Sequence, residues 1–268
     1  DRLTVTVFAG DQDAPRDTES ADIWQNIGIP VNKIFYYSKK DNWWGPAGQT
    51  GPCGPDTEIF YDSYPDQDPT GPDADDQRYV EIWNNVFMQY NKTSQATFDP
   101  MSQKNVDTGL GFERLVMFMQ NQTSVFATDL FQEMYQILQR HLDSDKTNIQ
   151  SERIILDHSR TAIMLLSEKL VPSNLEQGYV LRKVIRRAIR HMRKIGITDY
   201  NSLFQELANS LINSQDHPYP YSQYYPELIT NQDFIRSELT KEVDRFTHVL
   251  EKGLKEFEKN LEQINKYH

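Results

Sequence analysis

The sequence predicts an α+β protein, with an antiparallel sheet in residues 1–122 and a set of helices in residues 123–268. Strand-like runs follow one another through the first part with few helices between them, which is typical of antiparallel sheets. From about residue 115 the apolar residues recur every three or four positions instead, which is the period of an α-helix. A chain of 268 residues is also long enough for two domains of ordinary size.

The composition is that of a folded protein that stays out of the membrane. Hydrophobic residues make up 38% of the chain and charged residues 25%, which excludes a disordered polyelectrolyte. The single cysteine, Cys53, excludes an internal disulfide and a zinc site built from several thiolates, and it is typical of a reducing compartment. No run approaches the roughly 20 apolar residues of a membrane span, and no signal peptide is visible. We therefore expect a cytoplasmic protein.

The net charge of −11 is spread unevenly along the chain. Residues 1–150 hold 11 basic and 23 acidic residues, whereas residues 151–268 hold 17 and 16. Within the second part, residues 179–194 hold seven basic residues and no acidic one. This pattern predicts a local site for a polyanion and not a generally basic nucleic-acid surface.

The first elements of the chain are strands separated by one short helix. Residues 2–8 alternate apolar and polar side chains, which predicts a half-buried strand. A short helix is expected at 21–27, and further strands at 33–37, 57–61 and 80–90. The last strand is interrupted by the polar pair Asn84-Asn85, which must find hydrogen-bond partners or face a site.

Residues 41–56 are dense in glycine and proline, which favours a loop. A surface loop is the plainer interpretation. The adjacent Trp43 and Trp44 favour a binding loop instead, because indole rings need burial or a ligand to pack against.

Residues 106–115 combine a strand-like run, two glycines and a helix start. Gly109 and Gly111 let the backbone approach a ligand closely, and the first turn of a helix offers N–H groups to an anion. Arg114 adds a planar donor fork that suits phosphate oxygens, and Asp107 supplies a carboxylate for an ammonium group. By itself the pattern also fits a glycine turn followed by a surface arginine.

Helical periodicity follows at 117–122, 129–142, 151–170 and 179–194. The helix at 179–194 has an apolar stripe on one side and basic residues on the other, which favours contact with a phosphate backbone over an ordinary solvated face of mixed sign. From Gln232 a long helix is expected nearly to the end of the chain. It is interpreted as a strut against the other helices, with a coiled-coil seam as the alternative.

Several of these segments together resemble the alanyl-tRNA synthetase family, which belongs to the class II aminoacyl-tRNA synthetases. The matching segments occur in the order of the family and span essentially the whole chain. They are TGPCGP (50–55) with EIFYD (58–62), EIWN (81–84) with VFMQYN (86–91), VDTGLGFER (106–114), DHSR (157–160), and PSN (172–174) with GYVLR (178–182) and IRRA (185–188).

The resemblance implies that residues 1–122 are the later part of a catalytic domain with a partial class II sheet, and that GLGFER is motif 3. Alanine would be bound by Asn84 near its carboxylate, Val86 near its side chain, Asp107 at its ammonium group and Gly109. Trp44 would close the pocket, with Trp43 as the alternative. ATP, accompanied by Mg²⁺, would be bound by Gly111, Glu113 and Arg114. Arg114 and Asp107 would be the catalytic residues, and no residue is assigned as a metal ligand.

The resemblance also implies that residues 123–268 form an all-α tRNA-recognition domain for the acceptor stem of tRNA(Ala). Asn174 would read the G·U pair of that stem. The basic side chains that would follow its backbone are Arg182, Lys183, Arg186, Arg187, Arg190 and Arg193. The implied activity is alanine–tRNA ligation.

The sequence also departs from the family pattern. Asp56 stands where many relatives have a second cysteine. Motifs 1 and 2 are not found, and motif 2 supplies the arginine that holds the α-phosphate, so we expect these motifs on the same or another chain. The alternative function is a non-catalytic RNA-binding module derived from a synthetase.

Overall fold

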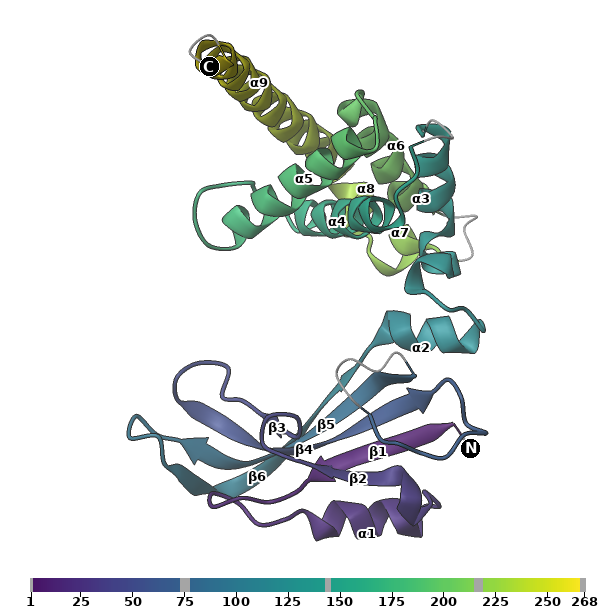
Figure 1. Ribbon diagram of the computed structural model, residues 1–268, viewed down its shortest axis with the longest axis vertical. Helices are drawn as coiled ribbons and strands as arrows, with labels where there is room; N and C mark the ends of the chain where they lie inside the picture. Colours follow the sequence, from purple (N-terminus) through teal and green to yellow (C-terminus); the bar gives the residue numbers. More distant parts are fainter. Residues whose placement is uncertain (1, 73–77, 143–145, 215–218, 266–268) are drawn as a thin grey trace. The chain divides into compact units, whose positions relative to one another are not determined.

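The computed structural model describes residues 2–72, 78–142, 146–214 and 219–265, with side chains described to residue 260. The chain forms two compact units, Asp1–Gln122 and Thr123–His268. Each unit is described by itself, and Figure 1 labels the elements of both.

The first unit is built on a six-stranded sheet with the order β2-β1-β4-β5-β6, and β3 pairs with β4 outside this path. The strands are β1 (Leu3–Phe8), β2 (Ile34–Tyr37), β3 (Trp43–Trp44), β4 (Gly51–Asp62), β5 (Tyr79–Lys92) and β6 (Phe98–Leu110). Helix α2 (Phe112–Met119) follows β6 directly.

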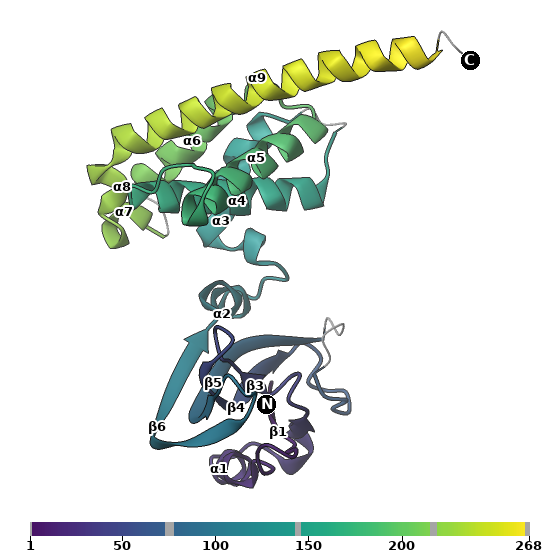
Figure 2. The same ribbon diagram turned by 90° about the vertical axis from the view of Figure 1, so that its left-hand side faces the viewer.

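The sheet is mixed, so the prediction of a wholly antiparallel sheet is wrong at one edge. β1 and β2 are parallel, whereas the other pairs are antiparallel. The physical reason is helix α1 (Thr18–Asn26), which lies between β1 and β2 in sequence and carries the chain back to the same end of the sheet. Its apolar side packs on one face of the sheet, where Val5, Val7, Ala21 and Ile34 form a buried cluster. Figure 2 shows α1 along that side of the strands.

One segment predicted as a loop, and another for which no strand was predicted, are strands. Residues 51–56 belong to β4, where a Cβ atom at Gly54 would lie 1.9 Å from the carbonyl oxygen of Phe87. Glycine therefore allows the close approach of β4 and β5 at this position. Residues 98–105 belong to β6, an edge strand whose residues are mostly exposed on both faces. Such a strand lacks the alternation of apolar and polar residues by which strands are recognised.

The regular elements among the described residues of the second unit are all helices. Its helices are α3 (Asp129–Arg140), α4 (Ile149–Ser167), α5 (Glu176–Lys194), α6 (Tyr200–Ile212), α7 (Tyr221–Tyr224), α8 (Glu227–Thr230) and α9 (Gln232–Asn265), with a 3₁₀ turn η2 (Val125–Ala127) at the start. The predicted apolar stripe of α5 is confirmed, because Leu181, Ile185, Ala188, Ile189 and Met192 are fully buried.

The long helix α9 changes character along its length (Figure 2). Its first turns pack against α4, α5, α6 and α8, and they bury Ile235, Leu239 and Val243. Farther along, Val249 and Phe257 are exposed. The strut interpretation therefore fits the first half of this helix. Within the part of the chain that the structure describes, no helix has the length and apolar character needed to cross a membrane.

Candidate functional site

Strand register brings most of the predicted amino-acid-binding residues onto one face of the sheet. Asn84 on β5 lies opposite Gly109 on β6, and Val86 lies opposite Asp107. Residues opposite one another on paired strands point to the same side, and so do residues two positions apart on one strand. These four residues therefore share a face, which is the face opposite α1.

This face offers three different kinds of contact to a small ligand. The Val86 side chain is buried and apolar. Asp107 is exposed, and its Oδ1 atom accepts a hydrogen bond from the backbone N–H of Thr108 at 2.8 Å. A Cβ atom built at Gly109 would meet nothing within 4 Å, so the sheet is open above this residue. The carboxylate of Asp107, the apolar side chain of Val86 and the open space above Gly109 therefore lie on one face of the sheet.

Arg114 lies in the first turn of α2 and is held against β5. Its Nη1 donates to the carbonyl oxygen of Glu81 at 2.7 Å and to Glu81 Oε2 at 3.1 Å. The side chain is 48% exposed, so the guanidinium also faces solvent. Gly111 leaves room for this side chain, because a Cβ atom there would lie 3.1 Å from Arg114 Cδ.

The start of α2 is also hydrogen-bonded to β5. The N–H of Gly111 donates to the carbonyl oxygen of Ile82 at 2.9 Å. Among the described residues, no side chain caps this helix, and Glu113 contributes a carboxylate to its first turn. The helix start and Arg114 thus lie beside the β5 segment that carries Asn84.

The two tryptophans of β3 occupy different environments. The ring of Trp43 packs between Phe8, Tyr90 and Phe98, with ring centroids 5.3–5.6 Å apart. Trp44 is 40% exposed. Trp43 is therefore part of an aromatic cluster, whereas Trp44 presents its ring to solvent.

Two carboxyl groups of β4, Asp56 and Glu58, join this face and were not singled out as site residues from the sequence. They lie opposite Val86 and Asn84, respectively. Burial raises the pKa of Asp56 to about 6, against the hydrogen bonds from Asn42 and Asn84. Burial, followed by the charges of Asp56 and Glu81, raises the pKa of Glu58 to about 8. Their spacing of two residues at the start of the strand predicted at 57–61 was the available signal, because residues two positions apart on a strand lie on one face.

In the second unit, Asn174 lies in the loop before α5, where its Oδ1 accepts a hydrogen bond from Arg182 Nη1. The guanidinium of Arg182 and the ammonium group of Lys183 lie 5.7 and 5.5 Å from the ring centre of Tyr179. Farther along α5, Arg187 donates to His158 Nε2 at 3.2 Å. Of the basic residues of α5 predicted to contact RNA, the exposed ones are Lys183, Arg187, Arg190 and Arg193, and these four are called the basic surface below.

Arg186 differs from the other predicted RNA-binding residues. Its Nε donates to Glu242 Oε1 at 2.6 Å, and Glu242 on α9 is 1% exposed. The guanidinium also lies 5.1 Å from the ring centre of Phe246. Arg186 thus neutralises a buried carboxylate and links α5 to α9. Next to it, a hollow of about 490 Å³ opens between basic rim residues, among them Lys183, Arg187 and Arg190.

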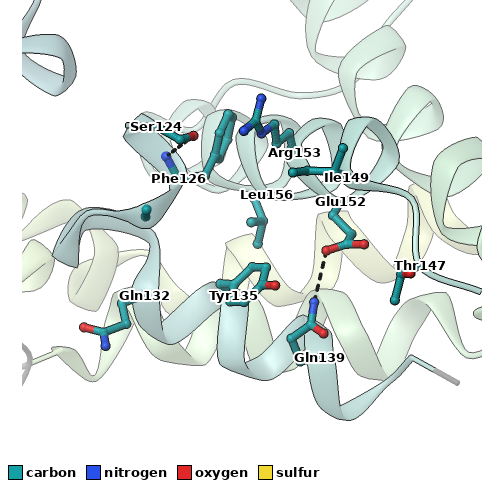
Figure 3. Close-up of a pocket in the computed structure, with 11 residues that line it drawn as sticks. Ser124, Phe126, Gln132, Tyr135, Gln139, Thr147, Ile149, Glu152, Arg153 and Leu156 are labelled. Carbon is teal, nitrogen blue, oxygen red and sulfur yellow. Dashed lines mark hydrogen bonds between the residues drawn. The ribbon is translucent and has the colours of Figure 1, made fainter. Parts of the chain in front are cut away.

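A hollow of about 580 Å³ lies elsewhere in the second unit, between η2, α3 and α4 (Figure 3). None of the residues predicted for a site lines it. Phe126, Tyr135 and Leu156 form much of its wall, with Arg153 5.7 Å from the ring centre of Phe126. Gln139 donates to Glu152 Oε2 at 3.1 Å across its side. In the described ranges of both units, no group of three or more His, Cys, Asp and Glu side chains is arranged to hold a metal ion.

The chain belongs to the class II tRNA synthetases, because the model of the family "tRNA synthetases class II (A)" matches residues 1–268. Within this class, its relatives include the alanine–tRNA ligases of Borrelia hermsii, Treponema denticola and Treponema pallidum. The identities are 40% over 277 residues, 45% over 244 and 42% over 267. These matches cover 99%, 88% and 97% of this chain. The predicted resemblance is therefore confirmed. The chain spans 39–45% of the length of these three relatives.

Proposed function

We propose that this chain supplies the alanine site, part of the ATP site and the tRNA-binding helices of an alanine–tRNA ligase. The observation that carries the proposal is the shared sheet face of Asn84, Val86, Asp107 and Gly109, followed directly by the α2 start and Arg114. The family, together with the alanine–tRNA ligases among its relatives, supports the assignment of substrates.

On this proposal, each residue of the face contacts a different part of alanine. Asp107 binds the α-ammonium group through a charge-assisted hydrogen bond. Val86 packs on the methyl group, and Trp44 covers the pocket from β3. The open space above Gly109 admits the ligand backbone. A pocket of this kind rejects glycine and serine poorly, because a methylene or hydroxyl group changes binding by only about 1–3 kcal/mol.

The reaction has two steps. A carboxylate oxygen of alanine attacks the α-phosphorus of ATP in line, and the bond from that phosphorus to the β-bridging oxygen breaks, so that alanyl-adenylate forms and pyrophosphate leaves. A hydroxyl group of the terminal ribose of tRNA then attacks the alanyl carbonyl carbon, loses its proton, and displaces AMP. Both steps depend on positioning and on neutralising phosphate charge.

In this chain, Arg114 and the N–H groups at the start of α2 are the proposed phosphate donors, with Gly111 and Glu113 beside them. Mg²⁺ is bound in such sites by one or two carboxylates together with phosphate oxygens and water. The ion would neutralise phosphate charge.

The second unit is proposed to bind the acceptor stem. Lys183, Arg187, Arg190 and Arg193 present one sign of charge along α5, as contact with a phosphate backbone requires. Asn174 and Arg182, which touch one another at the start of this surface, are proposed to read the G·U pair. Arg186 is engaged with Glu242 and contributes chiefly by fixing α5.

Alanine-dependent ATP–pyrophosphate exchange tests the catalytic half of the proposal. The chain is assayed together with a segment that carries motifs 1 and 2. Arg114→Ala should lower exchange by at least about tenfold, because a charged hydrogen-bond donor to the phosphates is lost. Arg140→Ala is the matched control, since Arg140 is an exposed arginine of α3 that pairs with Glu206. Full exchange by Arg114→Ala would refute the assignment of motif 3.

The second candidate function is a non-catalytic RNA-binding module, which the single-sign surface of α5 favours. Arg187→Ala should then weaken acceptor-stem binding and reduce the salt slope, log K against log salt concentration, by about one. The same effect is expected of the ligase, so the two functions are separated by the exchange assay. RNA binding without exchange, in the presence of motifs 1 and 2, would favour the module.

A further inference from the structure

The hollow of about 580 Å³ in the second unit contains a carboxylate that no cation of the described chain neutralises. This carboxylate belongs to Glu152, which is only 6% exposed. Its Oε1 accepts a hydrogen bond from the backbone N–H of Asn148 at 3.0 Å, and its Oε2 accepts one from Gln139 Nε2 at 3.1 Å. Both donors are uncharged. Among the residues that the structure describes, no Lys, Arg or His side chain forms an ion pair with Glu152.

One of the two Glu152 oxygens has a structural role. Glu152 lies in the first turn of α4, and the residue that donates to Oε1, Asn148, is the cap of this helix. Asn148 Oδ1 in turn accepts a hydrogen bond from the Ser151 N–H at 2.9 Å. This reciprocal cap, together with the positive end of the helix dipole, accounts for Oε1. It does not account for Oε2, which is joined to Gln139 of α3 at one end of the hollow (Figure 3).

The burial of Glu152 indicates what the hollow would bind. Buried carboxylates are normally paired with a cation, because uncharged donors replace only part of the hydration that the charge loses. A carboxylate offers about four lone-pair sites, so each Glu152 oxygen can accept a second hydrogen bond. An ammonium group in the hollow would supply both the missing positive charge and the donors. Water and salt screen such a pair less than one on the open surface.

The other walls of the hollow provide an apolar surface for the rest of a ligand. Figure 3 shows the rings of Phe126 and Tyr135 with Leu156 between them. The Phe126 ring is held in place by Phe131, whose ring centre is 4.9 Å away. Tyr135 is 41% exposed, so its ring remains in contact with water. A flat apolar group between the two rings would remove this surface from water, and aromatic faces also attract an ammonium group.

Arg153 also lines the hollow, and its positive charge opposes the binding of a cation. Its side chain is exposed, and its guanidinium lies 5.7 Å from the ring centre of Phe126. Water and salt screen an exposed charge far more than a buried one. The carboxylate of Glu152 therefore outweighs Arg153 in selecting the charge of a ligand.

We propose that this hollow binds a small organic amine, with its primary ammonium group on Glu152 Oε2 and a flat apolar body between Phe126 and Tyr135. A primary ammonium group is favoured over a quaternary one because it has hydrogen-bond donors for the carboxylate. The inference does not depend on the proposed function, since no residue assigned to alanine, ATP or RNA lines the hollow.

The first experiment titrates the full chain with three probes that share a benzene ring and differ in charge. At neutral pH 2-phenylethylamine is a cation, 2-phenylethanol is uncharged and 3-phenylpropanoate is an anion. ¹⁵N–¹H NMR measures each dissociation constant and locates the probe from the amide signals that move. We expect movement at residues 124–127, 135–139 and 149–156. The amine should bind about tenfold or more tightly than the alcohol, and the anion should bind most weakly.

Several results of this titration would overturn the proposal. They are equal affinities for the amine and the alcohol, tighter binding of the anion, no binding of the amine, and movement confined to amide signals outside the hollow. The comparison uses the unaltered chain, so it does not depend on whether a variant folds.

The second experiment separates the charge of the site from its aromatic wall. Glu152→Gln keeps an acceptor for the Asn148 N–H but removes the negative charge, so it should weaken the amine about tenfold and leave the alcohol unchanged. Tyr135→Ala removes one wall and should weaken both probes by a similar factor. The matched controls are Glu227→Gln, in the first turn of α8, and Tyr224→Ala, an exposed tyrosine of α7, and they should change neither affinity. Unchanged binding of the amine by Glu152→Gln would show that Glu152 does not hold the ammonium group and would overturn the proposal.

Discussion

Replacing Glu58 by glutamine should stabilise the first unit at alkaline pH. The pKa of Glu58 is raised from 4.5 to about 8, first by burial and then by the charge of Asp56. A carboxyl group with a raised pKa in the folded state contributes its full stability below pH 4.5, and that contribution is lost as the pH rises through 8. Glutamine cannot ionise, and its carbonyl oxygen can still accept the hydrogen bond from Asn84. The variant should therefore lack this loss of stability.

The magnitude follows from the pKa difference. Each pKa unit corresponds to about 1.4 kcal/mol, so a rise from 4.5 to about 8 would amount to about 5 kcal/mol for a fully buried group. Glu58 is only half-buried, and screening by solvent reduces the expected effect to about 2 kcal/mol. We compare the free energy of unfolding of Glu58→Gln with that of the unaltered chain at each pH. This difference should be about 2 kcal/mol more favourable to the variant at pH 9 than at pH 5.

Urea unfolding at several pH values, followed by tryptophan fluorescence, measures this difference. All four tryptophans lie within residues 1–122, so the signal reports on the first unit within the full chain. Asp99→Asn serves as the control, because it removes an exposed carboxylate from the same sheet. A difference between Glu58→Gln and the unaltered chain that is the same at pH 5 and pH 9 would refute the reasoning.

Two further predictions concern stability. Gly54→Ala should destabilise the first unit by more than about 3 kcal/mol, because the added Cβ would lie 1.9 Å from the Phe87 carbonyl oxygen. Urea unfolding followed by tryptophan fluorescence measures this change, and an unchanged midpoint would contradict the prediction. Arg186→Ala should destabilise the second unit by about 3 kcal/mol, because it removes the 2.6 Å hydrogen bond to the buried carboxylate of Glu242 and leaves it only the weaker pair with Arg245 at 4.0 Å. Thermal unfolding by circular dichroism tests it, and a further Glu242→Gln replacement should recover part of the loss.

The elements that the sequence predicts well are those whose signal is local. The stripe of α5 follows from the spacing of neighbouring apolar residues, and the structure confirms it. The strand predicted at residues 2–8 is β1, but the prediction that it is half-buried is wrong, because Thr4 and Thr6 are 0% exposed and Leu3 is 39% exposed in a strand that lies between β2 and β4. Helix α1 begins earlier than predicted, at Thr18, because Asp17 Oδ1 accepts a hydrogen bond from the Ser20 N–H at 2.9 Å. Such boundaries depend on caps and not on periodicity.

The features that the sequence did not predict depend on contacts between distant residues. The parallel pairing of β1 and β2 depends on how the two strands are arranged in the sheet, and the residue sequence of neither strand indicates the direction of its neighbour. Arg186 looks like its basic neighbours in sequence, and only its contact with Glu242, 56 residues away, distinguishes it. Asp56 stands in a segment rich in glycine and proline, so its place opposite Val86 becomes visible only from the register of β4 and β5.

Electrostatics limits what the first unit can do with ATP. The proposed phosphate donors lie beside Glu81, and Asp56 and Asp107 share the adjoining sheet face, so a triphosphate would approach charges of its own sign at neutral pH. Arg114 supplies one positive charge, and Glu81 already accepts two of its hydrogen bonds. On the proposed function, the remaining phosphate charge is neutralised by Mg²⁺ and by the arginine expected from motif 2. For this reason motifs 1 and 2 are required in the exchange assay, and adding them should raise nucleotide affinity far more than alanine affinity.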